Sequence, residues 1–237
     1  MKTKAIIAGC ALMFAGSAMA EGYNRAGLTY NLGHYNFNKD MEKATIAAGF
    51  DDFTGFCTNG FGINYAHGFS LSNTLPMYLE AGAELNFNFS NKKVDEELGI
   101  EYHRLFQDIN LNIPINFTWH FGISDNLTIA PYTGISFKIH MMTRQKDRIE
   151  GYGEKEESKW ISVYDDGDDA MGGKESTWNR FQMAWQIGAN AIYKNKYSIG
   201  LEYGYDMIPA YSHNFKDIAY QPRVTNGTFK IALGYIF

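Results

Sequence analysis

Cysteine, proline and long apolar runs are all scarce in this sequence. Its 237 residues include two cysteines and five prolines. No run of 18 apolar residues occurs after residue 20, so the sequence offers no candidate transmembrane helix there. If the first 20 residues are removed, Cys57 is the one remaining cysteine, and an intramolecular disulfide is excluded. With no catalytic pattern around it, Cys57 is expected to be an unpaired loop thiol.

Basic charge is also scarce. Without Lys2 and Lys4, residues 21–237 carry 19 basic and 26 acidic side chains, a net charge of −7. Nucleic-acid partners require a basic patch, so this balance argues against one.

The first 20 residues read as an export signal. Two lysines precede an apolar run, and Ala18–Ala20 forms an A-x-A cleavage site before Glu21. Ile7–Cys10 offers an alternative, a lipoprotein lipobox, but only about three apolar residues would precede it, against the roughly 7–15 of an ordinary hydrophobic region. We therefore predict a signal peptide over residues 1–20 and one domain over residues 21–237, exported in either case.

Aromatic residues and glycine are plentiful, at 16% and 24 residues. The segment Thr228–Phe237, TFKIALGYIF, shows how they are used. Every second residue is large and apolar, and those between are mostly small or polar, which is the period of a strand with one apolar face. The apolar positions are Phe229, Ile231, Leu233, Tyr235 and Phe237.

The same alternation recurs in seven earlier segments, and the connections between the eight strands alternate between long and short. No helix or internal repeat is evident, Ser90 to about His103 and Met141–Trp178 read as polar loops, and Pro114 predicts a local break or bulge. The predicted strands before the last one are Arg25–Phe37, Gly60–Phe69, Met77–Phe89, Arg104–Phe121, Leu127–His140, Asn179–Tyr193 and Tyr197–Met207.

One face of these strands carries carboxylates and amides, and the other is almost free of charge. A soluble barrel has the opposite arrangement, apolar inside and polar outside. In lipid every backbone polar group must pair, which a closed sheet achieves. We therefore predict an all-β fold, an eight-stranded antiparallel up-and-down transmembrane β-barrel in the outer membrane, with short periplasmic turns and long external loops.

The terminal TFKIALGYIF and segments such as NLNIPINFTWHF and TIAPYTGISF carry a resemblance to a known family. The chain resembles the small outer-membrane β-barrel domain proteins of Gram-negative bacteria, of the OmpA/OmpX type, over residues 21–237. The resemblance implies that the last strand is the signal for the barrel-assembly machinery, carried by Phe229, Ile231, Leu233, Tyr235 and Phe237. Functions in that family range over adhesion, structural anchoring, lipid-modifying enzymes and small pores, so membership does not choose between them.

Eight charged residues are predicted to face the barrel interior. An eight-stranded barrel is just wide enough for side chains to fill, which favours a salt-bridged plug over a polar conduit or a catalytic pocket. Depth along the strands predicts two layers of ion pairs, Glu84/Glu202/Lys230 in the middle and Asp108/Lys138/Arg180/Asp206 towards the rim. The predicted network comprises Glu80, Glu84, Asp108, Lys138, Arg180, Glu202, Asp206 and Lys230.

No catalytic, cofactor or metal site is predicted. His140 and His213 fall near the external rim of the predicted barrel. None of the six histidines belongs to a sequence motif whose spacing indicates catalysis; the other four are His34, His67, His103 and His120. Tyr164–Gly173 could collect Ca²⁺ with its carboxylates, but it lacks the ordered spacing of an EF-hand loop and reads as a solvated acidic loop.

The predicted function is that of a non-enzymatic structural or surface-interaction protein acting through its external loops. The alternatives are a small passive diffusion pore and a lipid-modifying outer-membrane enzyme. The longest connection, Met141–Trp178, is polar and too long for a periplasmic turn, so we expect it outside the cell. The expected partners are outer-membrane lipid and lipopolysaccharide, the barrel-assembly machinery and an external ligand of unknown identity, with the protein itself a monomer.

Overall fold

The computed structural model describes residues 22–47, 54–72, 74–97, 100–164, 178–212 and 221–237. The predicted signal peptide and the alternative lipobox lie outside these residues. In the described part of the chain, no helix has the length and apolar character needed to cross a membrane.

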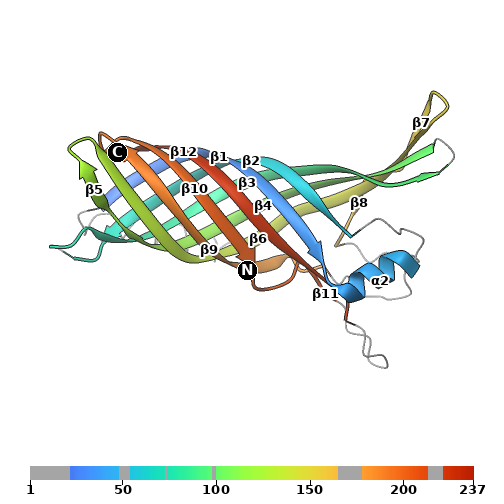
Figure 1. The fold of residues 1–237 in the computed structure, drawn as a ribbon, viewed down its shortest axis with the longest axis horizontal. Helices are drawn as coiled ribbons and strands as arrows, with labels where there is room; N and C mark the ends of the chain where they lie inside the picture. Colours follow the sequence, from blue (N-terminus) through green and yellow to red (C-terminus); the bar gives the residue numbers. More distant parts are fainter. Residues whose placement is uncertain (1–21, 48–53, 73, 98–99, 165–177, 213–220) are drawn as a thin grey trace, which may run out of the picture.

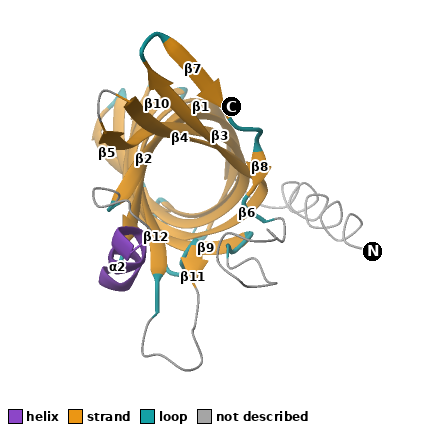
Figure 2. Cartoon of the chain, turned by 90° about the vertical axis from the view of Figure 1, so that its right-hand side faces the viewer, coloured by secondary structure: helices purple, strands orange, loops and turns teal. Residues whose placement is uncertain are grey.

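Eight antiparallel strands pair in sequence order and close into a ring, which confirms the predicted fold (Figure 2). The ring closes where the first strand pairs with the last, from Arg25 opposite Ile236 to Phe37 opposite Val224. The ring strands are β1 (Gly22–Phe37), β2 (Gly55–Ser70), β3 (Met77–Glu97), β4 (Ile100–Trp119), β6 (Leu127–Gly151), β9 (Phe181–Tyr193), β10 (Tyr197–Asp206) and β12 (Arg223–Ile236).

The alternation predicted from the sequence sets the two faces of this ring. Leu28, Leu201 and Leu233 are 62%, 52% and 57% exposed on the outside, whereas Asn86 and Asp108 are 2% and 1% exposed inside. A polar interior within an apolar exterior is the arrangement that a lipid environment requires.

The short connections lie at one end of the barrel. Between β9 and β10, Lys194 and Asn195 both have positive φ, 51° and 55°, and the Lys196 amide donates to the Tyr193 carbonyl. Two consecutive residues of positive φ form a turn whose twist matches the right-handed twist of the flanking strands. At the same end, β5 (Phe121–Ser124) pairs with the start of β6 (Figure 1).

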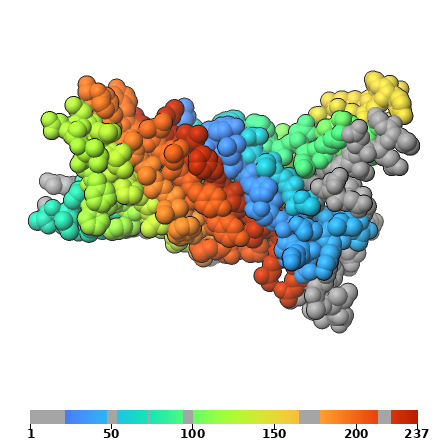
Figure 3. Space-filling view, viewed as in Figure 1, coloured from blue at the N-terminus to red at the C-terminus, as the bar shows by residue number. Residues whose placement is uncertain are grey.

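At the opposite end, β3, β4 and β6 continue beyond the other strands as a twisted ribbon. This ribbon and the hairpin strand that follows β6 are here called the outer arm: residues 91–97, 100–107 and 144–157. The prediction of loops over Ser90–His103 and much of Met141–Trp178 is therefore wrong. These segments lack apolar alternation, but cross-strand polar pairs such as Arg104 with Asp147 hold them in the ladder. The arm adds β7 (Glu154–Glu157) at its tip and β8 (Ile161–Ser162) at its base, and it stands clear of the barrel (Figures 1 and 3).

One helix occurs among the described residues, so the sequence-based expectation of no helix is wrong. Helix α2 (Lys39–Ala47) follows β1 at the same end as the outer arm (Figure 1). Asn38 caps it, because its side-chain oxygen accepts a hydrogen bond from the Met41 amide. The Asn38 amide donates to the Arg223 carbonyl, and the short strand β11 (Tyr211–Ser212) pairs with β12 nearby.

The predicted irregularity at Pro114 is a local break without a bulge. Pairing of β4 with β3 passes from Ala81 opposite Ile115 to Glu84 opposite Asn112 with no register shift, and Pro114 keeps its partner Ser136 in β6. The register shift in β4 falls instead between Ile109 and Asn110, where β6 has the extra residue Met141. Beyond Met141 the inward positions of β6 change from even to odd numbers.

Candidate functional site

A buried lysine joins three strands in the middle of the barrel. Lys230 of β12 lies opposite Glu202 of the neighbouring strand β10, and its Nζ is 2.9 Å from the Glu202 carboxylate. The same Nζ is 3.0 Å from the carboxylate of Glu84 in β3, which is separated from β12 by β1 and β2. The Tyr132 hydroxyl also donates to Glu202 at 2.9 Å. This layer therefore ties together walls of the barrel that are not adjacent in the sheet.

A second charged layer lies towards the short turns. Arg25 of β1 donates to the Glu80 carboxylate at 2.6 Å and to the Asn190 side chain at 2.9 Å, and the Tyr23 hydroxyl donates to Glu80 at 3.0 Å. Sequence reasoning placed Glu80 inside but missed its partner Arg25. The signal was present, because Arg25 has the same parity as the inward residues Thr29 and Asn31.

A third charged layer lies towards the outer arm. Lys138 of β6 and Asp206 of β10 form an ion pair at 2.5 Å. The Asp108 carboxylate contacts the His140 Nδ1 at 2.6 Å and accepts a hydrogen bond from the Thr143 hydroxyl at 2.7 Å. The predicted layer of Asp108, Lys138, Arg180 and Asp206 is thus divided into two separate pairs, and histidine takes the place expected of Arg180.

The assignment of Arg180 to the interior is wrong. Strand β9 begins only at Phe181, and Arg180 precedes it as an exposed residue at the barrel rim. Its guanidinium lies over the Tyr164 ring, 4.2 Å from the centroid. Strand parity predicts orientation only inside the ladder, so it fails for a residue just outside it.

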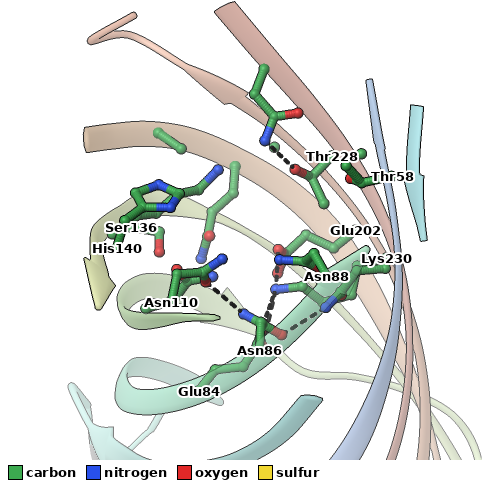
Figure 4. A pocket seen from close by; sticks show the side chains of 18 of the residues that line it. Thr58, Glu84, Asn86, Asn88, Asn110, Ser136, His140, Glu202, Thr228 and Lys230 are labelled. Atoms are coloured by element: carbon green, nitrogen blue, oxygen red, sulfur yellow. Dashed lines mark hydrogen bonds and ion pairs between the residues drawn. The ribbon is translucent and has the colours of Figure 1, made fainter. Parts of the chain in front are cut away.

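The space between the middle and third layers is small. A cavity of about 40 Å³ is lined by polar side chains that include Asn86, Asn110, Ser136, His140 and Lys230 (Figure 4). Asn86 bridges the walls around it, accepting from Asn31 at 2.6 Å and donating to Asn110 at 3.2 Å. This volume admits a few water molecules, each of which needs roughly 10–15 Å³ of such space.

An apolar cluster lies above the polar layers, at the end that carries the outer arm. Tyr35 stacks on Phe56 with ring centroids 4.5 Å apart, and Phe106 meets Tyr35 edge-on at 5.6 Å. Sequence reasoning missed this cluster, because its strand residues occupy positions of the otherwise polar face. We call it the mouth cluster: Tyr35, Phe56, Phe106, Val163, Ala210 and Val224.

The sequence matches the outer membrane protein beta-barrel domain family over residues 6–237. The chain belongs to this family. It is therefore an integral β-barrel of the Gram-negative outer membrane, and its apolar exterior faces lipid. Comparison with curated proteins finds no match.

Several solved structures of outer-membrane proteins are similar. Ail, the attachment invasion locus protein of Yersinia pestis, is 12% identical, with 90% of this chain and 99% of that chain covered and a TM-score of 0.34. OprG from Pseudomonas aeruginosa is 9% identical, with 92% and 96% covered and a TM-score of 0.38. Neisserial surface protein A is 9% identical, with 89% and 96% covered and a TM-score of 0.33.

The face of β12 that the resemblance assigns to barrel assembly points outward. Its role in assembly stays a prediction, but its exposure meets one requirement for recognition by another protein. The exposed fractions are 40% for Phe229, 36% for Ile231, 57% for Leu233, 45% for Tyr235 and 63% for Phe237.

The outer arm is covered with ion pairs. Lys146 and Arg148 both donate hydrogen bonds to the Glu157 carboxylate of β7. These hydrogen bonds lower the pKa of Glu157 to about 2, and the one from Lys146 has the largest effect. Trp160 lies beside Arg144 and Lys146, whose charged groups are 4.8 and 5.1 Å from its ring centroid. The arm thus presents a dense set of charges with an aromatic residue at its base.

The five described histidines do not gather into one site. His140 is inside the barrel, His120 and His67 lie near its short-turn end, and His34 faces outward with its Nδ1 3.2 Å from the Cys57 sulfur. His213 and the acidic residues 165–173 fall outside the described residues. His103 alone among the described histidines stands on the outer arm, next to Glu101.

Proposed function

We propose that this protein is a non-enzymatic outer-membrane barrel that presents the outer arm to the cell exterior for interaction with an external ligand. The observation that carries the proposal is the contrast between its two parts. Three polar layers and the mouth cluster fill the interior, whereas the arm extends far beyond the ring and exposes charged side chains. In this proposal the apolar outer face of the barrel contacts lipid, lipopolysaccharide and the barrel-assembly machinery. The protein acts as a monomer.

The position of the buried histidine supports a non-enzymatic role. His140 and Asp108 form the hydrogen-bonded pair that a general base would need, but both side chains are at most 4% exposed. A lipid substrate lies outside the barrel wall, and a base must reach the atom whose proton it takes. The pair therefore fits a structural role better than lipid modification.

Purified wild-type protein is expected to show little steady conductance in a planar bilayer. The reason is that Lys230 links opposite walls and the mouth cluster covers the layers above it, so these described side chains obstruct the passage of water and ions along the barrel. The measurement is single-channel current over a range of voltages. A large, stable, ohmic conductance would reject the filled interior and favour the diffusion pore.

The tip of the outer arm is expected to be reachable from outside intact cells. In a Cys57→Ser background, Tyr152→Cys at the arm tip should react with a membrane-impermeant maleimide, because Tyr152 is 82% exposed. Lys196→Cys, in the short turn at the opposite end, is the matched control and should react only after the outer membrane is opened. Reversed labelling of the two variants would mean that the arm faces the periplasm.

A further inference from the structure

Three side chains of metal-binding type meet on one face of the outer arm. Glu101 and His103 alternate along β4, and Glu150 lies directly opposite Glu101 on β6. One carboxylate oxygen from each glutamate and one imidazole nitrogen all lie within 4.8 Å of one another. Sequence reasoning missed this group because Glu150 is 47 residues beyond His103 and joins it only through the register of the ribbon.

The pairing of Glu101 with Glu150 needs a positive charge nearby. Like charges directly opposite in a sheet are destabilising. The described cations around them are Lys93, 3.0 Å from Glu101, and Arg148 and Lys155, 3.4 and 3.9 Å from Glu150. Lys93 lies beside Glu101 and the other two lie beside Glu150, and exposed ion pairs of this kind contribute little to stability.

We propose that Glu101, His103 and Glu150 bind a transition-metal dication such as Zn²⁺. The proposal deepens the surface role proposed above and rests on it only for placing the site outside the cell. An imidazole with two carboxylates is a ligand set that Zn²⁺ accepts, with bonds of about 2.0–2.2 Å. Ca²⁺ and Mg²⁺ prefer oxygen ligands throughout, so the histidine selects against them.

The exposure of the site suits exchange with the surroundings. The side chains of Glu101 and Glu150 are 41% and 39% exposed, and that of His103 is 16% exposed. Three protein ligands leave a fourth tetrahedral position for water or for a donor from another molecule. The metal would thus give the outer arm a specific point of attachment.

The flanking lysine gives the proposal its sharpest test. If the cluster binds metal, Lys93 competes for Glu101, and Lys93→Gln should bind Zn²⁺ several-fold more tightly than the wild type. His103→Ala should bind at least tenfold more weakly, because losing even a supporting residue of a zinc site costs about 10–100-fold. His34→Ala is the matched control, since His34 is an exposed histidine beside the one described cysteine.

The experiment is titration calorimetry of Zn²⁺ into each refolded, detergent-solubilised protein, with Co²⁺ absorption as a second readout of the ligand set. Binding of one Zn²⁺ by the wild type, weakened by His103→Ala, strengthened by Lys93→Gln and unchanged in His34→Ala, would support the proposal. No stoichiometric binding, binding unaffected by His103→Ala, or binding lost in His34→Ala would overturn it. Because the titration uses purified protein, a failure to bind Zn²⁺ would overturn the metal site without bearing on the orientation of the arm. The maleimide experiment tests that orientation separately.

Discussion

Replacing Leu201 with arginine is expected to prevent stable folding of the barrel in lipid. Leu201 lies on the outer face of β10, between the aromatic residues Tyr197 and Tyr205, and opposite Ile231 of β12. This position is near the middle of the apolar wall, where an arginine facing lipid costs about 2–4 kcal/mol. The measurement is the fraction of protein that gains heat-modifiable gel mobility after refolding into vesicles.

Tyr152→Arg is the matched control for this substitution. The exposed fraction of Tyr152 is larger than that of Leu201, at 82% against 52%. If both residues faced water, neither arginine substitution would change the stability much, because isolated substitutions on a solvent-exposed surface have small effects. Tyr152 lies at the tip of the outer arm, outside the apolar wall, so Tyr152→Arg should fold like the wild type. Equal behaviour of the two variants would refute the assignment of the outer face of β10 to lipid.

The second large effect is expected inside the barrel. Lys230→Met leaves Glu84 and Glu202 without the cation that both contact, and these residues are buried or nearly so. Removing one partner of a buried ion pair costs about 3–5 kcal/mol, because the remaining charge is uncompensated. We expect a correspondingly lower free energy of unfolding, measured by urea titration of the protein in vesicles.

The glutamates provide the control for this loss. Adding Glu84→Gln and Glu202→Gln to Lys230→Met removes the orphaned charges and should restore much of the stability, since amides can still hydrogen-bond with Tyr132 and with one another. Lys194→Met, in the exposed turn, should have no measurable effect. A triple variant no more stable than Lys230→Met alone would show that the loss comes from packing and not from charge.

The closing strand shows how far local pattern reaches. Phe229 to Phe237 alternate with small or polar residues, and this period of two places each side chain on one of two faces whatever the rest of the chain does. The same holds for Leu28, Leu201 and Asn86, all of which lie on the side that their parity predicts. The eight ring strands and the inverted distribution of polarity follow from this local rule.

The partners inside the barrel depend on register, which the pattern leaves open. The layer of Glu84, Glu202 and Lys230 was predicted from depth along the strands, and the structure has it. The contact of Arg25 with Glu80 across β2 was not predicted. Such contacts depend on how far the strands are staggered around the closed ring. The extra residue Met141 adds a change of parity that brings Thr143 rather than Met142 to Asp108.

The sequence alone determined that this chain is a barrel with lipid outside and charge inside, because alternation is a property of consecutive residues. Only the tertiary structure decided that Phe106 and Tyr35 cap the interior, that Arg180 lies outside it, and that Glu150 stands opposite Glu101. Those contacts join residues far apart in the chain. They require closure of the ring and one particular register, and neither is encoded in the period of any single strand.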